Sequence, residues 1–482
     1  MTPPPLPNVR DALTVARRMQ DFPARFSPML VKELRQGMRT NLFSVAFILL
    51  QTVMVLSLLA GLAGPGSAAA DGFFWFFVVV MLLIVQPLRG FNALSSEYLL
   101  NTMDLIQLTR LDAWRITLGK WTALNAQTLL FLTGVLPYLV MRYFLGNVDF
   151  VTDLVGLLFL GLGSALASAI TIGCSAFRPF VLRGILVIAF GIGFIILYVA
   201  MQTMILRSGL GGSNLATMGL TAISLLYGCF FFLSFGASRI APLSENHSTR
   251  KRLVALGFTA LALGFLWFDT EEAVLIVVGL ILGFACVDAL TEPLPVYSKV
   301  LEPFRRHPLG RLGATFLTPG WMGGIWFFLL CFGVFTLVAL YSAQFFSSSP
   351  FPTGDRVEFV TSMLSSANLF LFPLIFIHLF FPKHASGSFT FGIYTFIQGC
   401  LLLLTIMIAA LAEALDRFDH LIFALVPIPS ILLVALKNGG ANSQFELIYL
   451  ATAFLTLLLG IAIPLLRQRA AVSDYLHHLN RR

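Results

Sequence analysis

The sequence has 482 residues, of which 58% are hydrophobic and only 11% are charged. Soluble domains carry about 25% charged residues, so this composition excludes a water-soluble globular enzyme and predicts an all-α, polytopic membrane protein. The net charge of +8 does not predict nucleic-acid binding, because the Lys and Arg residues are scattered among the predicted loops. The five cysteines lie inside apolar runs without CxxC spacing, which predicts neither a disulfide framework nor a metal site.

Apolar segments recur along the whole chain, with lengths near the roughly 20 residues that a membrane-spanning helix requires. These segments are Leu42–Leu62, Phe73–Leu88, Trp121–Met141, Leu154–Ser175, Gly184–Met204, Leu220–Phe235, Leu253–Phe268, Ala273–Ala289, Trp321–Tyr341, Met363–Phe381, Phe391–Leu411, Leu421–Leu436 and Phe445–Leu466. The segment Leu421–Leu436 is short and contains Pro427 and Pro429, which interrupt the hydrogen-bond ladder of a helix. We therefore expect a bundle of about twelve spanning helices with a re-entrant hairpin at 421–436.

The positions of the basic residues predict the orientation of this bundle. With the N-terminus in the cytoplasm, the cytoplasmic side holds all 31 Lys and Arg except Arg142, Arg207, Arg356, Arg417 and Lys437. Residues 1–40 then form a cytoplasmic leader that lacks an apolar stretch long enough for a signal peptide. Residues 41–240 form a first block of six helices. Residues 241–482 form a second block of about six helices with a short cytoplasmic tail.

An amphipathic helix is predicted over residues 27–39, just before the first span. Ser27 is a suitable N-cap, and Pro28 suits the first helical position. Leu30, Leu34 and Met38 recur every four residues, while Lys32, Glu33, Arg35, Gln36 and Arg39 occupy the other face. We expect this helix to lie flat at the cytoplasmic interface with its apolar stripe in the headgroup region. It is either a simple anchor or a lever that couples a cytoplasmic partner to the first span.

The cytoplasmic loop over residues 88–120 is too apolar for a simple connector. Leu100, Met103, Ile106 and neighbouring leucines need a covering surface. Asp112 is placed to cap a short helix that begins at Ala113, and Trp114 projects from its first turn. A large aromatic residue flanked by charges is typical of a protein-interface anchor, although tryptophan is also common at membrane edges.

Together these two segments resemble the permease subunits of ABC-2 type exporters, most specifically over about residues 27–144. The leader helix matches through Pro28 and the sequence Lys32, Glu33, Leu34 and Arg35. The loop matches through Ser96, Glu97, Thr102, Leu105, Thr109, Leu111, Gly119 and Lys120. The resemblance implies that the residues coupling the chain to an ATPase are Glu97, Thr102, Asp104, Thr109, Arg110, Leu111, Asp112, Trp114 and Arg115.

The resemblance also implies the partners and location of the chain. It implies a transport subunit in the bacterial cytoplasmic (inner) membrane, without catalytic activity of its own, that pairs with a separate ATPase and with a second permease copy or paralogue. ATP and Mg²⁺ would bind to the ATPase, because this sequence contains no phosphate-binding loop: Gly119, Lys120 and Trp121 lack the upstream glycine and the following hydroxyl residue. Membrane lipid is the remaining expected partner, and the substrate is not predicted.

Two other classes stay open. A secondary transporter usually has ionisable groups deep in its spans. Here Asp288 and Glu413 lie at span ends, where their side chains are expected to extend to water, and His378 is expected to bond a carbonyl of a neighbouring helix. A membrane-embedded enzyme needs converging acids and bases; Asp416, Asp419, His477 and His478 are expected to be solvated instead. Two pairs of glycines, Gly279 with Gly283 and Gly320 with Gly324, predict helix packing and a turn into a span, respectively.

Overall fold

The computed structural model describes most of the chain, and every regular element in the described residues is a helix. The described residues are 28–63, 68–99, 112–145, 149–177, 179–208, 212–242, 245–268, 270–294, 304, 308–345, 356–381, 388–414, 443–469 and 472–473. The helices pack into two compact units, Met1–Ser175 and Ala176–Arg482. The packing boundary thus lies inside the block 41–240 that the sequence predicts, and a functional division at residue 240 stays a prediction.

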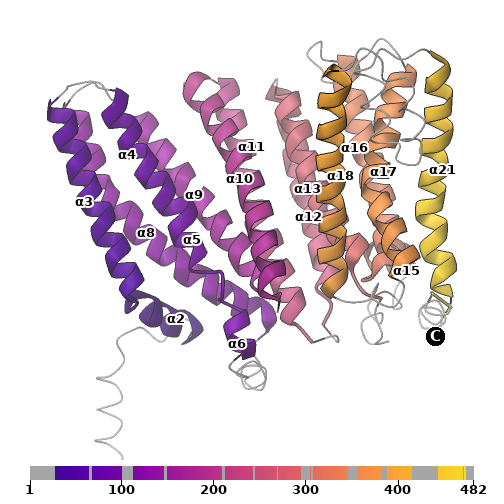
Figure 1. Ribbon diagram of the computed structural model, residues 1–482, viewed down its shortest axis with the longest axis horizontal. Helices are drawn as coiled ribbons and strands as arrows, with labels where there is room; N and C mark the ends of the chain where they lie inside the picture. Colours follow the sequence, from indigo (N-terminus) through magenta and orange to yellow (C-terminus); the bar gives the residue numbers. More distant parts are fainter. Residues whose placement is uncertain are drawn as a thin grey trace, which may run out of the picture. The chain divides into compact units, whose positions relative to one another are not determined.

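Unit 1 is a bundle of long helices with one short helix across its end (Figure 1). Its elements are α2 (Pro28–Met38), α3 (Asn41–Ala63), α4 (Ala68–Val80), the π-helix η1 (Met81–Val85), α5 (Gln86–Leu88), α6 (Ser95–Leu99), α8 (Ala113–Leu145) and α9 (Phe150–Cys174). Helix α8 packs against α2, α3 and α9. The π-helix widens one turn of the second span directly before Gln86 and Pro87, and such turns are frequent at functional sites.

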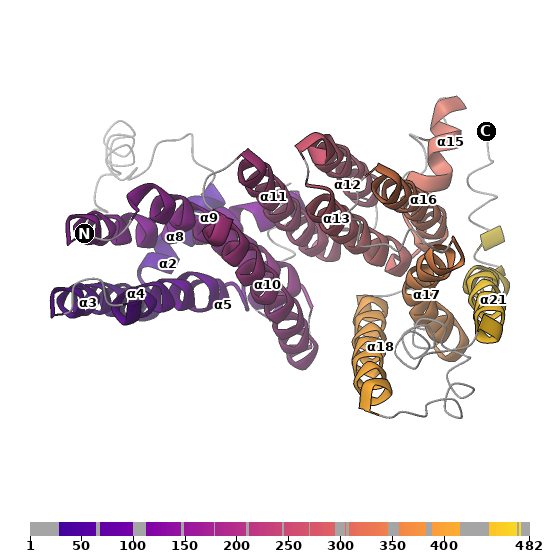
Figure 2. The ribbon, with the colours of Figure 1, turned by 90° about the horizontal axis from the view of Figure 1, so that it is seen from above.

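Unit 2 is a larger bundle in which α13 is the central helix. Seen from above in Figure 2, α13 has α11 and α12 on one side and α16 and α17 on the other. The elements are α10 (Phe180–Ser208), α11 (Gly212–Ile240), α12 (Ser248–Leu263), the 3-10 helix η2 (Gly264–Phe268), α13 (Glu271–Thr291), α15 (Pro308–Leu317), α16 (Trp321–Phe345), α17 (Arg356–Phe380), α18 (Ser388–Ala414) and α21 (Ser443–Arg467).

The helices of both units have the length and composition of membrane spans. Among the described residues, nine are long and apolar enough to cross a membrane: Asn41–Leu62, Asp71–Leu88, Ala113–Leu145, Phe150–Cys174, Leu215–Ile240, Ser248–Phe268, Glu272–Thr291, Trp321–Ser342 and Leu450–Arg467. Their outer faces remain apolar; Ile48 on α3 is 63% exposed and Leu337 on α16 is 68% exposed. Such large exposed apolar surfaces match lipid and not water, so the chain is a multi-pass membrane protein.

Small residues allow close helix packing where the sequence predicts it. Gly279 and Gly283 on α13 face the rings of Phe335 and Phe370, which confirms their place in bundle packing. Gly320 has a φ of 103° and forms the turn into α16, as predicted. Gly324 lies in the first turn of α16, where an added Cβ would be 2.1 Å from the Ala289 carbonyl oxygen. This glycine therefore fixes the close contact between α16 and α13.

Candidate functional site

Helix α2 packs against α8 at Gly119, where α8 has no side chain. The helix forms over Pro28–Met38, as the sequence predicts, with proline in its first turn. Met29 is 8% exposed, and its side chain lies over Gly119, where an added Cβ would be 3.1 Å from the Met29 Cγ atom. Met29 precedes the predicted stripe of Leu30, Leu34 and Met38, so the start of α2 is held by a protein contact.

Beside this contact, charged residues from three helices of unit 1 meet. Lys120 Nζ on α8 donates to Glu33 Oε1 on α2 at 2.8 Å and to Glu97 Oε1 on α6 at 3.0 Å. Lys32 Nζ lies 3.9 Å from Glu97 Oε1. The side chain of Lys120 is 5% exposed and that of Glu97 is 8% exposed, whereas that of Lys32 is 56% exposed. We call these four residues the Lys120 cluster.

The Lys120 cluster joins the two segments that carry the family resemblance. Glu33 belongs to the leader motif, whereas Glu97 and Lys120 belong to the loop motif. The sequence predicts that Glu33 lies on the polar outer face of the leader helix; the structure instead turns its carboxylate toward the buried Lys120.

Helix α8 differs from its prediction in length. The sequence predicts a short helix from Ala113 and a separate span from Trp121; the structure has one continuous helix of 33 residues, Ala113–Leu145. The start is as predicted, with the Asp112 carbonyl accepting from the Ile116 amide at 3.2 Å. The helix continues through Gly119 and Lys120 because both residues are buried against α2 and α6, which offsets the weak helix propensity of glycine.

Arg89 fixes the other end of α2. Its Nη2 donates to the Gly37 carbonyl at 2.8 Å and to Thr40 Oγ1 at 3.2 Å, while Nη1 donates to Gln86 Oε1 at 3.1 Å and also bonds Gln127. A cation at the C-terminal carbonyls of a helix is favoured by the helix dipole. Burial lowers the pKa of Arg89. Helix α2 is therefore tied to the second and third spans at both of its ends.

The predicted coupling residues separate into those that the structure describes and those that it does not. Glu97 lies in α6 and is buried, Trp114 is half-buried in the first turn of α8, and Arg115 beside it is exposed. Lys32 and Arg35 are exposed on α2, whereas Leu34 is half-buried. Five predicted residues fall outside the described residues, namely Thr102, Asp104, Thr109, Arg110 and Leu111. So do the leader before Pro28 and the predicted hairpin at 421–436.

Arg142 forms a second charge cluster of unit 1 at the far end of α8. Its Nη2 lies 2.6 Å from Asp71 Oδ1 on α4, and Nη1 lies 3.6 Å from Asp153 Oδ2 on α9. The guanidinium also stacks 4.2 Å from the ring centroid of Phe74. The Lys120 cluster thus lies near the start of α8 and the Arg142 contacts lie near its end. At 1.5 Å per residue this helix of 33 residues is about 50 Å long.

Unit 2 contains a buried charge network that the sequence did not predict. Lys251 Nζ on α12 lies 2.5 Å from Asp288 Oδ2 and 2.9 Å from Glu292 Oε1 at the end of α13. Arg252, 2% exposed, bonds Glu292 Oε2 at 3.0 Å and the carbonyls of Phe316, Thr318 and Gly320. Burial alone would raise the pKa of Glu292, but Lys251 and Arg252 outweigh it and lower that pKa.

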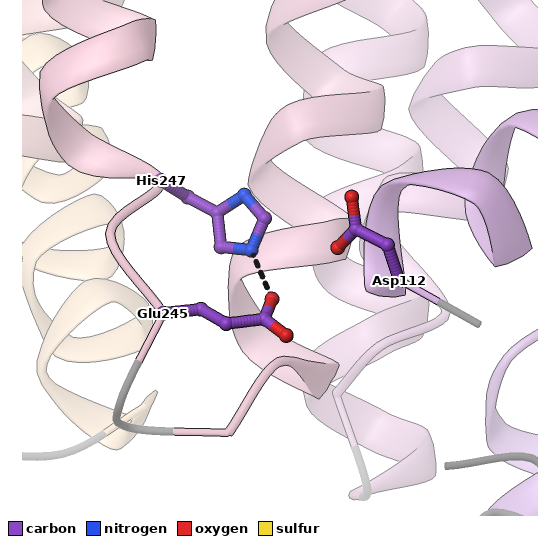
Figure 3. Close-up of side chains that lie close together, drawn as sticks. All are labelled: Asp112, Glu245 and His247. Carbon is purple, nitrogen blue, oxygen red and sulfur yellow. Dashed lines mark hydrogen bonds and ion pairs between the residues drawn. The ribbon is translucent and has the colours of Figure 1, made fainter. Parts of the chain in front are cut away.

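Two expectations about polar residues of unit 2 are wrong. Asp288 does not extend to water from its span end, because Lys251 holds it at 4% exposure. His378 bonds the carbonyl of Leu374 on its own helix at 3.0 Å, not one on a neighbouring helix. In the loop before α12, His247 Nε2 lies 2.8 Å from Glu245 Oε2 (Figure 3).

Comparisons of the chain with protein-family models, curated proteins and solved structures find no match. The class of protein therefore follows from its helices: the chain is a multi-pass membrane protein.

Proposed function

We propose that the chain is the permease subunit of an ABC-2 type transporter, an exporter driven by ATP hydrolysis on a separate ATPase. The supporting observation is the Lys120 cluster, because Lys120 bonds both Glu33 and Glu97. The leader and loop motifs lie 87 residues apart between Glu33 and Lys120, and two unrelated chance matches would have no reason to pair through a buried cation. The cluster therefore supports a single functional unit built from both motifs.

The contacts suggest how an ATPase would act on this unit. The partner would dock at the loop around Asp112, Trp114 and Arg115, at the start of α8. A displacement there would move α8 as one body, because its first two turns are tied to α2 through Lys120 and Gly119. In the last turn of the same helix, Arg142 holds α4 and α9. Movement at the docking loop would thus reach the far side of the membrane.

The proposed topology has twelve spans with the N-terminus in the bacterial cytoplasm and the tail on the same side. Its support in unit 2 comes from helix ends. Trp321 Nε1 at the start of α16 bonds Gln468 Oε1 just after α21 at 3.0 Å, so α21 ends where α16 begins. Since α16, α17, α18 and α21 alternate in direction, α18 ends and α21 begins on the opposite side (Figure 1). The described helices from α16 to α21 thus return the chain to the side on which α16 begins, which supports a tail on that side.

Co-purification tests the proposal. The parent chain, Trp114→Ala, Asp112→Lys and Phe144→Ala are each purified in mild detergent from the native host. Phe144 is the control, since it is 77% exposed at the other end of α8. An ATPase with a phosphate-binding loop should accompany the parent and Phe144→Ala, and both docking variants should retain much less of it. If no ATPase accompanies the parent, or if all four chains retain it equally, the proposal fails.

A secondary transporter is the second candidate, and the buried network on α12 and α13 favours it. Ionisable residues buried in membrane segments often mark proton or ion pathways, and Lys251, Asp288 and Glu292 are all under 10% exposed. A transport assay distinguishes the ATP-driven permease from the secondary transporter. Cells are depleted of ATP while a proton gradient is maintained, and transport into or out of them is measured. Transport that continues under these conditions, and stops in Asp288→Asn, supports the secondary transporter and excludes the permease.

A further inference from the structure

Arg239, in the last turn of α11, lies among three aromatic rings from three segments of unit 2. Its guanidinium carbon is 5.0 Å from the ring centroid of Phe235, 5.6 Å from that of Phe391 and 5.7 Å from that of Phe177. All three distances are within the range of cation–π attraction, about 6 Å. The rings also contact one another, with Phe235 and Phe391 centroids 4.5 Å apart. The three rings therefore hold the guanidinium between them.

The edge donors of this guanidinium have no hydrogen-bond partner among the described residues. Arginine carries five N–H donors in its plane. Within the described part of the chain, Arg239 contacts the three rings but donates to no hydrogen-bond acceptor. Arg252 nearby is the opposite case, because it bonds three carbonyls and a carboxylate. Arg239 is also half-buried, not enclosed, so its donors remain accessible to a ligand.

The local charge is positive and unbalanced. Asp288 and Glu292 interact electrostatically with Arg239, but they are already paired with Lys251 and Arg252 at 2.5–3.0 Å. Among the described residues of this network, three cations therefore face two anions, which leaves one positive charge in excess. A positive charge that is partly removed from water without an anion is costly, and an added oxyanion would balance it.

The surroundings of Arg239 indicate the kind of anion. Arg239 lies at the end of the candidate span Leu215–Ile240, where lipid headgroups meet the protein. Next to Phe177 along the chain, α10 begins with an exposed apolar stripe at helical spacing: Val181 is 70% exposed, Ile185 51%, Ile188 60% and Ile192 53%. A ligand with a charged head and a long apolar tail fits both features, and a free inorganic anion fits only the first.

We propose that Arg239 and its three rings form a binding site for the phosphate of an anionic lipid, whose acyl chain lies along α10. The planar guanidinium binds two phosphate oxygens through its edge, while the rings keep it from turning toward Asp288 and Glu292. The site is separate from the Lys120 cluster, and it would exist whether or not an ATPase partner is found.

Lipid binding by the purified full chain tests the proposal. Native mass spectrometry counts bound phosphatidylglycerol, and thermal unfolding in micelles measures the shift caused by phosphatidylglycerol, phosphatidylcholine or inorganic phosphate. Arg239→Gln removes the donors, and Arg250→Gln is the matched control, an exposed arginine on α12 near Phe230. The parent and Arg250→Gln should bind phosphatidylglycerol in preference to phosphatidylcholine, and Arg239→Gln should lose this preference.

A more conservative variant covers the case in which Arg239→Gln does not fold. Arg239→Lys keeps the charge but not the planar fork, so it should weaken phosphatidylglycerol binding about tenfold. Equal phosphatidylglycerol binding by the parent and Arg239→Lys, or by the parent and a folded Arg239→Gln, overturns the site. Equal stabilisation by phosphatidylglycerol and phosphatidylcholine overturns the role of the anion. An equal effect of inorganic phosphate overturns the lipid assignment.

Discussion

Removal of the Lys120 amine should destabilise unit 1 far more than removal of the exposed lysine beside it. Lys120→Met keeps most of the side-chain volume but leaves Glu33 and Glu97 without the cation that they share at 2.8 Å and 3.0 Å. Breaking a buried ion pair by removing one partner typically costs about 3–5 kcal/mol. Lys32→Met removes a cation whose side chain is 56% exposed and 3.9 Å from Glu97, and such pairs contribute below about 1 kcal/mol.

Equilibrium denaturation with sodium dodecyl sulfate in mild-detergent micelles, followed by circular dichroism, measures these free energies of unfolding. Glu97→Gln should fall between the two lysine variants, because Lys120 keeps Glu33 as a partner. The double variant Lys120→Met with Glu97→Gln should be more stable than the sum of the single effects, by about 0.5–3 kcal/mol. The cluster has no structural role if Lys120→Met and Lys32→Met destabilise the protein equally, or if the two single effects simply add.

Three further substitutions probe other close contacts. Gly324→Ala places a Cβ 2.1 Å from the Ala289 carbonyl oxygen and should lower the free energy of unfolding by about 1–3 kcal/mol or more. Gly333→Ala on the same helix is the control, because its Cβ meets nothing within 4 Å. It should be neutral or stabilising in the same denaturation assay. Arg252→Lys cannot bond three carbonyls and Glu292 together, so size-exclusion chromatography should show a large loss of folded protein, whereas Arg250→Lys should behave as the parent does. Arg142→Met leaves Asp71 and Asp153 without their cation and should lower the unfolding temperature, and an unchanged temperature would show that this end of α8 is held by apolar packing alone.

The apolar segments and turn residues made much of the helical architecture predictable. Pro28 begins α2 and Ala113 begins α8, both as the sequence indicates, because these starts depend on residues within one turn. Nine helices are long and apolar enough to be spans in the described residues. The count of twelve and the hairpin stay predictions, since 421–436 lies outside the described residues.

The charge clusters were not predictable in the same way, because they join residues far apart in the chain. The sequence places Glu33 on the solvated face of α2. In the structure, the packing of α2 against Gly119 brings Glu33 to Lys120. Lys251 and Arg252 follow Arg250 and suggest a solvated basic loop, yet both lie near the start of α12 and are buried. A usable signal was present: Asp288 and Glu292 are four residues apart at the end of an apolar helix, on one face, and need buried cations.

Photo-cross-linking at the start of α8 tests the central claim most directly. A photoreactive amino acid replaces the exposed Arg115 in the native host, and another replaces Phe144 at the far end of the same helix. Position 115 should cross-link to a polypeptide that has a phosphate-binding loop and hydrolyses ATP, and position 144 should not. If position 115 captures no such ATPase, or if a membrane-impermeant reagent labels it from outside intact cells, this end of α8 does not face an ATPase and the proposed function is wrong.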